Sequence, residues 1–120
     1  MQLSNSERKV MNVFWEKGPL RARDAAAELN VHLGWSKTTS YTMLTRCVEK
    51  GFLSRSDPHF LCTPLVTRKQ VCEENTDTLI DRDYGGSADL LVASLVNRKK
   101  LSSRQMKELY DILRQMEEEQ

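Results

Sequence analysis

The sequence predicts a mostly α-helical fold with one small β-hairpin. Six segments have helical spacing of their apolar residues, and each is bounded by a capping residue or a stop signal. Between the third and fourth of these segments lie two short β-prone runs around an Asp57-Pro58 turn. A chain of 120 residues makes one ordinary domain, or a small domain with an appendage.

The first helix is expected to begin after Ser4 and to end before Gly18. Ser4 and Glu7 have the spacing of a capping box, in which each side chain accepts a hydrogen bond from the other residue's backbone amide. Val10 and Phe14 belong to one apolar stripe at helical spacing. Gly18 accepts the left-handed conformation that ends many helices, and the proline after it cannot continue the helix.

The second helix is expected from about Ala22 to Leu33, after a very short strand near Leu20 and Ala22. Arg21 stands at the N-cap position, where Ser, Thr or Asp would serve better, and Gly34 stops the helix. The residues expected to face the core are Ala25, Ala26, Leu29 and Leu33.

The third helix is expected from Lys37 to Lys50, with Ser36 as its N-cap and Gly51 as its stop. Its inward residues should be Ser40, Met43, Leu44, Cys47 and Val48. The hairpin should pair residues 52–55 with residues 60–63. The order helix, short strand, helix, helix, hairpin is that of a winged helix-turn-helix, which we assign to residues 1–66 as a DNA-binding domain.

Residues 67–120 are expected to form a helical dimerisation region. Thr67 and Gln70 form another capping box, for a helix that reaches Tyr84, and Ser87 and Ser102 should cap two further helices. Their narrow apolar stripes cannot make a stable monomeric core, so a second copy of the chain should cover them. The residues expected at that interface are Leu79, Leu90, Leu91, Leu95, Val96, Met106, Leu109, Tyr110 and Leu113.

The outer face of the third helix has the chemistry of a recognition helix. It carries hydroxyls, a phenol and two cations, with no acid before Glu49. Thr has a low helix propensity, so its presence on an exposed helix face indicates a function for its side chain. Residues 1–66 hold nine Lys and Arg against six Asp and Glu, whereas the remainder holds nine against eleven. The predicted DNA contacts are Ser36, Lys37, Thr38, Thr39, Tyr41, Thr42, Thr45 and Arg46 on this helix, with Arg55 and His59 in the hairpin.

Other classes of function find little support in the sequence. No nucleophile–base pair, Gly-rich phosphate loop or carboxylate cluster stands at a useful spacing, so we expect no enzyme and no cofactor. The histidines and cysteines lack the spacing of a metal site, and the cysteines are expected to be free thiols. No apolar run approaches the ~20 residues of a membrane span and no signal peptide is recognised, so the protein is expected in the cytoplasm.

The sequence resembles the penicillinase repressor (BlaI/MecI/CopY) family of bacterial winged-helix regulators. The most specific element is the block Trp35-Ser36-x-x-Thr39-x-x-Thr42-x-x-x-Arg46, followed by Lys50-Gly51. The other matching stretches, in chain order, are Leu3-Ser4 with Glu7 and Val10-Met11, Phe14 to Leu20, Gly34 to Thr39, Tyr41 to Leu44, Lys50 to Leu53, Thr63 to Val66, Gly85-Gly86, and Leu101-Ser102 with Glu108-Leu109.

This resemblance implies a homodimer that binds a palindromic double-stranded DNA operator and represses antibiotic or stress resistance genes. In the β-lactam branch a membrane sensor peptidase leads to cleavage of an Asn-Phe bond, and the matching position in this chain is Ser94-Leu95. Copper-responsive members carry a CxC pair near the C-terminus, which this chain lacks. The operator, the regulated genes and the inducing signal stay open, as does thiol chemistry at Cys62 or Cys72. The alternative hypothesis is a winged-helix protein-interaction module that does not bind DNA.

Overall fold

The computed structural model describes residues 2–119 and divides into two compact units, one up to Thr76 and one from Asp77 onward. The elements, in chain order, are α1 (Asn5–Lys17), β1 (Leu20–Arg21), α2 (Ala22–Leu33), α3 (Lys37–Glu49), β2 (Leu53–Ser56), β3 (Leu61–Pro64), α4 (Arg68–Asp83), α5 (Ala88–Asn97) and α6 (Ser103–Glu118). The predicted fold class, mostly helical with a small β-wing, is confirmed. No helix within the described residues is long and apolar enough to cross a membrane.

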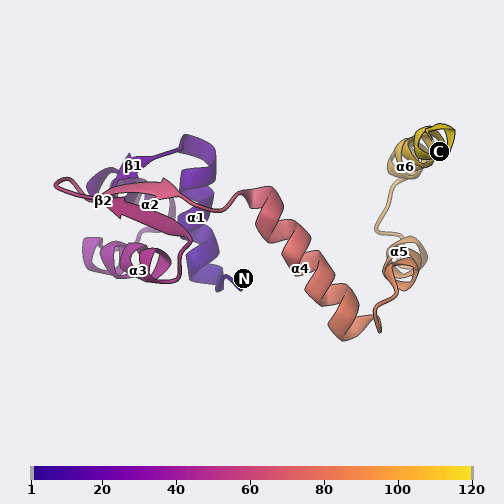
Figure 1. The fold of residues 1–120 in the computed structure, drawn as a ribbon, viewed down its shortest axis with the longest axis horizontal. Helices are drawn as coiled ribbons and strands as arrows, with labels where there is room; N and C mark the ends of the chain where they lie inside the picture. The colour runs from indigo at the N-terminus through magenta and orange to yellow at the C-terminus, as the bar shows by residue number, and fades with distance from the viewer. Residues whose placement is uncertain (1, 120) are drawn as a thin grey trace. The chain divides into compact units, whose positions relative to one another are not determined.

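The three strands form one antiparallel sheet in the order β1-β3-β2. β2 and β3 are the hairpin of the wing, with Leu53 opposite Pro64 and Ser56 opposite Leu61. β1 adds to the free edge of β3, where Leu20 lies opposite Cys62. In Figure 1 the sheet lies with α1, α2 and α3 in the indigo-to-magenta part of the chain, as the winged-helix order predicts.

The local signals for α1 and α3 act as the sequence predicts. Ser4 Oγ accepts from the Glu7 amide at 3.1 Å, and Glu7 Oε1 accepts from the Ser4 amide at 2.7 Å, which completes the capping box. Gly18 has a φ of 77° and its amide donates to the Phe14 carbonyl, so the glycine closes α1. Ser36 Oγ accepts from the Thr39 amide at 3.1 Å at the start of α3. Arg21 makes no side-chain cap to α2, as its residue type indicates.

One core joins the three helices to the sheet. Its largest fully buried apolar side chains include Phe14 and Met11 from α1, Leu29 from α2, Leu44 from α3 and Leu53 from β2. Burying a side chain of this size stabilises the fold by ~1.5–3 kcal/mol. The inward stripe predicted for α3 is confirmed, with Ser40, Met43, Leu44 and Cys47 buried and Val48 packed against them.

The start of α4 belongs to the first unit. Val71 is fully buried in the core, and the Trp15 indole donates to the Val66 carbonyl at 2.9 Å. The Arg68 guanidinium lies 5.5 Å from the centre of the Trp15 ring and donates to Asn12 Oδ1 at 3.4 Å. The Thr67–Gln70 capping box also forms. Because of these contacts the first compact unit extends to Thr76, whereas the sequence places the end of the DNA-binding domain at residue 66.

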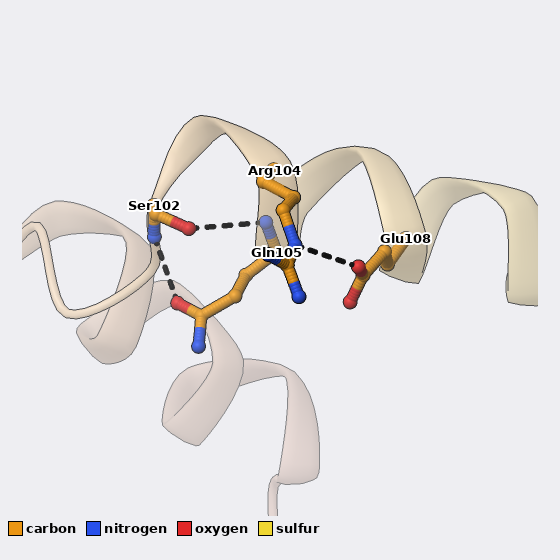
Figure 2. A network of polar contacts seen from close by, with 4 residues as sticks. All are labelled: Ser102, Arg104, Gln105 and Glu108. Atoms are coloured by element: carbon orange, nitrogen blue, oxygen red, sulfur yellow. Dashed lines mark hydrogen bonds and ion pairs between the residues drawn. The ribbon is translucent and has the colours of Figure 1, made fainter.

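The second unit has few buried side chains. No residue of α5 or α6 in the described chain is fully buried, and their large apolar side chains are exposed or half-buried. Figure 2 shows how α6 begins: Ser102 Oγ accepts from the Gln105 amide at 3.1 Å, and Gln105 Oε1 accepts from the Ser102 amide at 2.9 Å. Arg104 and Glu108, one turn apart, form an ion pair at 3.1 Å. α6 is therefore locally well specified although it lacks a core of its own.

Two local expectations are wrong. Ser87 stands at the N-cap of α5 but makes no capping bond, because its hydroxyl donates to the carboxylate of Asp89 instead. Leu33, in the last position of α2, is exposed rather than part of the core, since the helix ends at Gly34 before another turn could cover it.

Candidate nucleic-acid interface

The N-terminus of α3 is exposed and free of acidic side chains. Lys37 and Thr38 occupy its first turn and are exposed. Free amides and the helix dipole make such a terminus favourable for a phosphate. Two predicted contacts here are already engaged with each other: Ser36 Oγ accepts from the Thr39 amide and donates to Thr39 Oγ1 at 3.0 Å. Ser36 and Thr39 therefore stabilise the first turn of α3, and Lys37 supplies the positive charge that would attract a phosphate.

Further along α3, the predicted contacts share one exposed face. Tyr41, Thr42, Thr45, Arg46 and Glu49 line an open hollow of about 420 Å³. Arg46 is the only cation of this lining, and Glu49 is its only acid, one helical turn nearer the C-terminus. A cation with hydroxyl and methyl groups beside it suits the edges of DNA bases or a phosphate.

Thr42 presents only part of its hydrogen-bonding capacity. Its hydroxyl donates to the Thr38 carbonyl at 2.9 Å, one turn earlier in the helix. With the proton committed to the backbone, the oxygen of Thr42 remains an acceptor and the methyl group remains available. Such a side chain matches a base amino group or a thymine methyl better than a phosphate, which requires a donor.

The wing meets α3 through a row of side chains. The Tyr41 ring on α3 is half-buried and meets Phe60 edge to face, with ring centroids 6.0 Å apart and an interplanar angle of 82°. Lys37 Nζ lies 5.7 Å from the centre of the Tyr41 ring, and the Arg55 guanidinium lies 3.7 Å from that of Phe60. Lys37, Tyr41, Phe60 and Arg55 thus form a cation–aromatic–aromatic–cation row, here called the wing stack.

The other wing residues differ in their surroundings. Arg55 Nε also donates to Asp57 Oδ1 at 3.1 Å, so the guanidinium of Arg55 has two partners, the Asp57 carboxylate and the Phe60 ring. His59, the remaining predicted wing contact, is exposed. The structure thus links Arg55 to Tyr41 of α3 through Phe60, whereas for His59 it shows an exposed side chain.

Sequence reasoning missed two residues of this surface. A hollow of about 350 Å³ between α2 and α3 is lined by Arg23 of α2 together with Lys37 and Tyr41. Arg23 is exposed and forms a long ion pair with its neighbour Asp24 at 3.8 Å. In a helix-turn-helix the first helix of the motif crosses the DNA backbone, which is the signal that points to Arg23. Phe60 was missed because only the folded hairpin brings it to α3.

The remaining chemistry-bearing groups within the described residues are side chains of the types that bind metal ions, among them three free thiols. Within residues 2–119 no three His, Cys, Asp or Glu side chains are grouped so as to hold a metal ion. Cys47 and Cys62 are buried free thiols, and burial raises the pKa of Cys47 to about 12 and that of Cys62 to about 11. Cys72 is a free thiol on the exposed side of α4.

The residues predicted for dimerisation lie mainly at the surface of the second unit. Leu79, Leu91 and Leu95 are half-buried within it. The exposed members of the predicted set are Leu90, Val96, Met106, Leu109, Tyr110 and Leu113. Val92, Ile112 and Met116, which are not among the interface residues named above, are each more than half exposed. Ser94 and Leu95, at the position that matches the cleaved bond, lie within α5 and are half-buried.

Comparison with known proteins identifies the family of this chain. A family model described as penicillinase repressor matches residues 3–115. The penicillinase repressor of Bacillus licheniformis is 30% identical over 114 residues, which cover 93% of this chain and 89% of that protein.

Two solved structures match the first part of the chain. The solution structure of the DNA-binding domain of the repressor BlaI matches at a TM-score of 0.53 and 31% identity, covering 57% of this chain and 87% of that one. The monomeric form of Bacillus licheniformis BlaI in complex with the blaP half-operator matches at a TM-score of 0.50 and 30% identity, covering 58% and 88%. These relatives are repressors rather than enzymes. On the family model and on this identity, the chain belongs to the penicillinase repressor family.

Proposed function

We propose that this protein is a dimeric transcriptional repressor that binds a palindromic operator through α3 in the major groove. The observation that carries the proposal is the exposed face of α3 from Lys37 to Arg46, which holds no acidic side chain and is linked to the wing cation Arg55 through Phe60. The family model and the relative bound to a half-operator support it. Its place is then the cytoplasm, where bacterial DNA lies.

The division of labour on this surface follows from chemistry. Lys37 at the start of α3 and Arg23 on α2 are placed for phosphates, whose contacts set the position of the protein on the duplex. Thr42, Thr45 and Arg46 lie further along the helix, where side chains reach base edges and so carry sequence preference. Arg55 adds a backbone contact from the wing.

Dimerisation is proposed for the second unit. α5 is apolar almost all round, with Leu90, Val92 and Val96 exposed, and a helix of that composition is normally covered on every side. α6 is amphipathic, with exposed Leu109 and Leu113 on one stripe. Two copies that cover these stripes join two DNA-binding units, and the second half-site is then bound at a high effective concentration.

Release by an inducing signal would act on this dimer. A membrane sensor peptidase that cuts near Ser94-Leu95 would separate the DNA-binding unit from α6, although the bond lies inside α5 and that helix must open first. The regulated genes are proposed to be resistance genes, as the name of the penicillinase repressor relative indicates for that protein.

The test is a mobility shift with footprinting on DNA upstream of the protein's own gene, together with its mass in solution. A dimer that protects a palindrome with half-sites about one helical turn apart would support the proposal. The double variant Lys37→Ala, Arg46→Ala should lose this protection, whereas a control with Lys69→Ala, at an exposed position of α4, should keep it. A folded protein that binds no duplex even at low salt would overturn the proposal in favour of a protein-interaction module.

A further inference from the structure

Phe60 adopts a conformation that its residue type disfavours. Its φ is +48°, in the left-handed region where a bulky side chain is uncommon and a glycine would be at ease. The backbone is held there because the Phe60 carbonyl accepts a hydrogen bond from the Ala22 amide at 2.9 Å, at the first residue of α2. Strain of this kind persists where the surroundings fix it, and it is frequent at functional positions.

The side chain of Phe60 makes use of this backbone position. The Arg55 guanidinium lies 3.7 Å from the centre of the Phe60 ring, and the same ring meets Tyr41 of α3 edge to face. Phe60 is therefore the only residue of the wing stack that contacts both the wing cation and the helix. Glycine would remove the strain at this position but would leave nothing between Arg55 and Tyr41.

Arg55 itself keeps donors available for a ligand. Its ion pair with Asp57 uses Nε, so neither terminal NH₂ group has a hydrogen-bond partner in the described part of the chain. The Phe60 ring, whose centre lies 3.7 Å from the guanidinium carbon, restrains the guanidinium without using those donors. A restrained guanidinium with free terminal groups is suited to a phosphate oxygen pair.

We propose that Phe60 is a positioning residue for DNA binding, which couples Arg55 of the wing to Lys37 of α3 so that the two cations hold the phosphate backbone as one unit. This inference rests on the proposed function, because it assigns a role within the DNA-binding surface. Phe60 does not touch DNA in this proposal. It acts through the orientation of Arg55.

The alternative is that Phe60 has a purely structural role and fills space between the wing and α3. Both ideas predict weaker binding when the ring is removed, so affinity alone does not separate them. They differ in how the loss depends on Arg55. If the ring only stabilises the fold, removing the Arg55 charge should lower the DNA affinity equally whether or not the Phe60 ring is present. If the ring positions Arg55, removing the Arg55 charge should no longer lower the affinity once the ring is absent.

The experiment measures binding of the full-length protein to a random-sequence duplex as a function of salt, because phosphate contacts do not depend on sequence. Arg55→Gln should make the negative slope of log affinity against log salt shallower by about 1. Phe60→Leu should make it shallower by the same amount, and adding Arg55→Gln to Phe60→Leu should change the slope no further. Phe60→Tyr keeps the ring and should bind like the wild type.

The outcomes separate the inference from the proposed function. If the folded wild-type protein binds no duplex at low salt, the proposed function fails. If it binds, but Arg55→Gln costs as much in Phe60→Leu as in the wild type, only the inference is overturned. If Phe60→Leu does not fold by circular dichroism, the pair Lys37→Gln and Arg55→Gln decides. A double variant that loses less than the sum of the single losses supports coupling, and additive losses overturn it.

Discussion

The carboxylate of Glu7, fully buried at the start of α1, lies 2.7 Å from the ammonium group of Lys50 at the end of α3. Glu7 therefore serves two helices, because its other oxygen completes the capping box with Ser4. The ammonium group supplies a partner for Glu7 Oε2, which makes no other hydrogen bond in the described chain. This contact fixes the C-terminal end of α3 against α1, and so helps to set the direction in which the proposed recognition helix points.

This ion pair predicts a pH dependence of folding stability. Burial alone would raise the pKa of Glu7, but the hydrogen bonds from Lys50 and Ser4 outweigh it and hold the pKa below its ordinary value of 4.5. A carboxyl group with a lowered pKa in the folded state stabilises the fold above its unfolded pKa, and this contribution is lost as the pH falls through the folded pKa.

Glu7→Gln should accordingly lower the free energy of unfolding by about 1–3 kcal/mol at neutral pH. The deficit should shrink as the pH falls below 4.5, where the wild-type carboxylate takes up a proton. Urea unfolding across the acid range would measure this. Glu16→Gln, at an exposed position of the same helix, is the control and should change little. A deficit that stays constant into strong acid would contradict the assigned ion pair.

Removing the negative charge of Asp57 in the wing should strengthen DNA binding. Its carboxylate is exposed and pairs with Arg55, so it places a negative charge next to the proposed phosphate contact. Asp57→Asn should strengthen binding to any duplex several-fold at low salt, and the gain should fade as salt rises. Asp111→Asn, exposed on α6, makes the same change of charge elsewhere and should leave affinity for a short half-site unchanged. Equal gains from both variants would count against a local effect in the wing.

Ser40 and Ser36 predict opposite effects of the same substitution on one helix. The Ser40 hydroxyl is buried in the core and has no hydrogen-bond partner among residues 2–119, and such a group costs stability. Ser40→Ala should therefore raise the free energy of unfolding by about 1 kcal/mol. Ser36→Ala removes the N-cap of α3 and should lower it by about 1 kcal/mol. Thermal unfolding of both variants measures the two signs, and destabilisation by Ser40→Ala would show that its hydroxyl has a partner.

The sequence predicted the elements well where the signal is local. The boxes Ser4–Glu7 and Ser102–Gln105 each lie within a single turn, so spacing alone identified both. Ser87 shows the limit of this reasoning, since Asp89 competes for its hydroxyl and the residue type at the cap position does not decide which bond forms.

Contacts between distant parts of the chain were not predicted. The bond from Trp15 to the Val66 carbonyl and the contact of Phe60 with Tyr41 depend on where the hairpin ends and how it lies against the helices. Periodicity places a residue on a face but does not identify its partner across the fold. The candidate DNA surface was therefore predicted on α3, whereas Phe60 and Arg23 needed the folded structure.

The three cysteines predict distinct reactivities. Burial raises the pKa of Cys47 to about 12 and that of Cys62 to about 11, so neither forms thiolate near neutral pH. Cys72 is exposed on α4. A thiol reagent should modify Cys72 rapidly and the other two only as fast as the fold opens, which mass spectrometry of the labelled protein would resolve. Cys72→Ser is the control and should abolish the rapid phase. Rapid labelling of Cys62 in the folded protein would contradict the assigned burial.

A substitution at Leu113 should weaken the proposed dimer without affecting the fold of the first unit. Its side chain is 59% exposed on α6, on the same stripe as Leu109. Covering a leucine stabilises a complex by ~1.5–3 kcal/mol, and in a symmetric dimer the gain occurs twice. Leu113→Asp should thus raise the dimer dissociation constant roughly a hundredfold or more.

The matched control for this variant is Gln115→Asp, which adds the same charge at an exposed position away from the stripe and should leave the dimer intact. Sedimentation would measure the dissociation constants. Because α6 contributes no buried residue, the unfolding of the first unit should be the same in both variants. Affinity for a single half-site should also be kept, whereas affinity for the full palindrome should fall with the dimer. A Leu113→Asp protein that remains as tight a dimer as the control would remove α6 from the interface, and the exposed apolar face of α5 would then have to carry it.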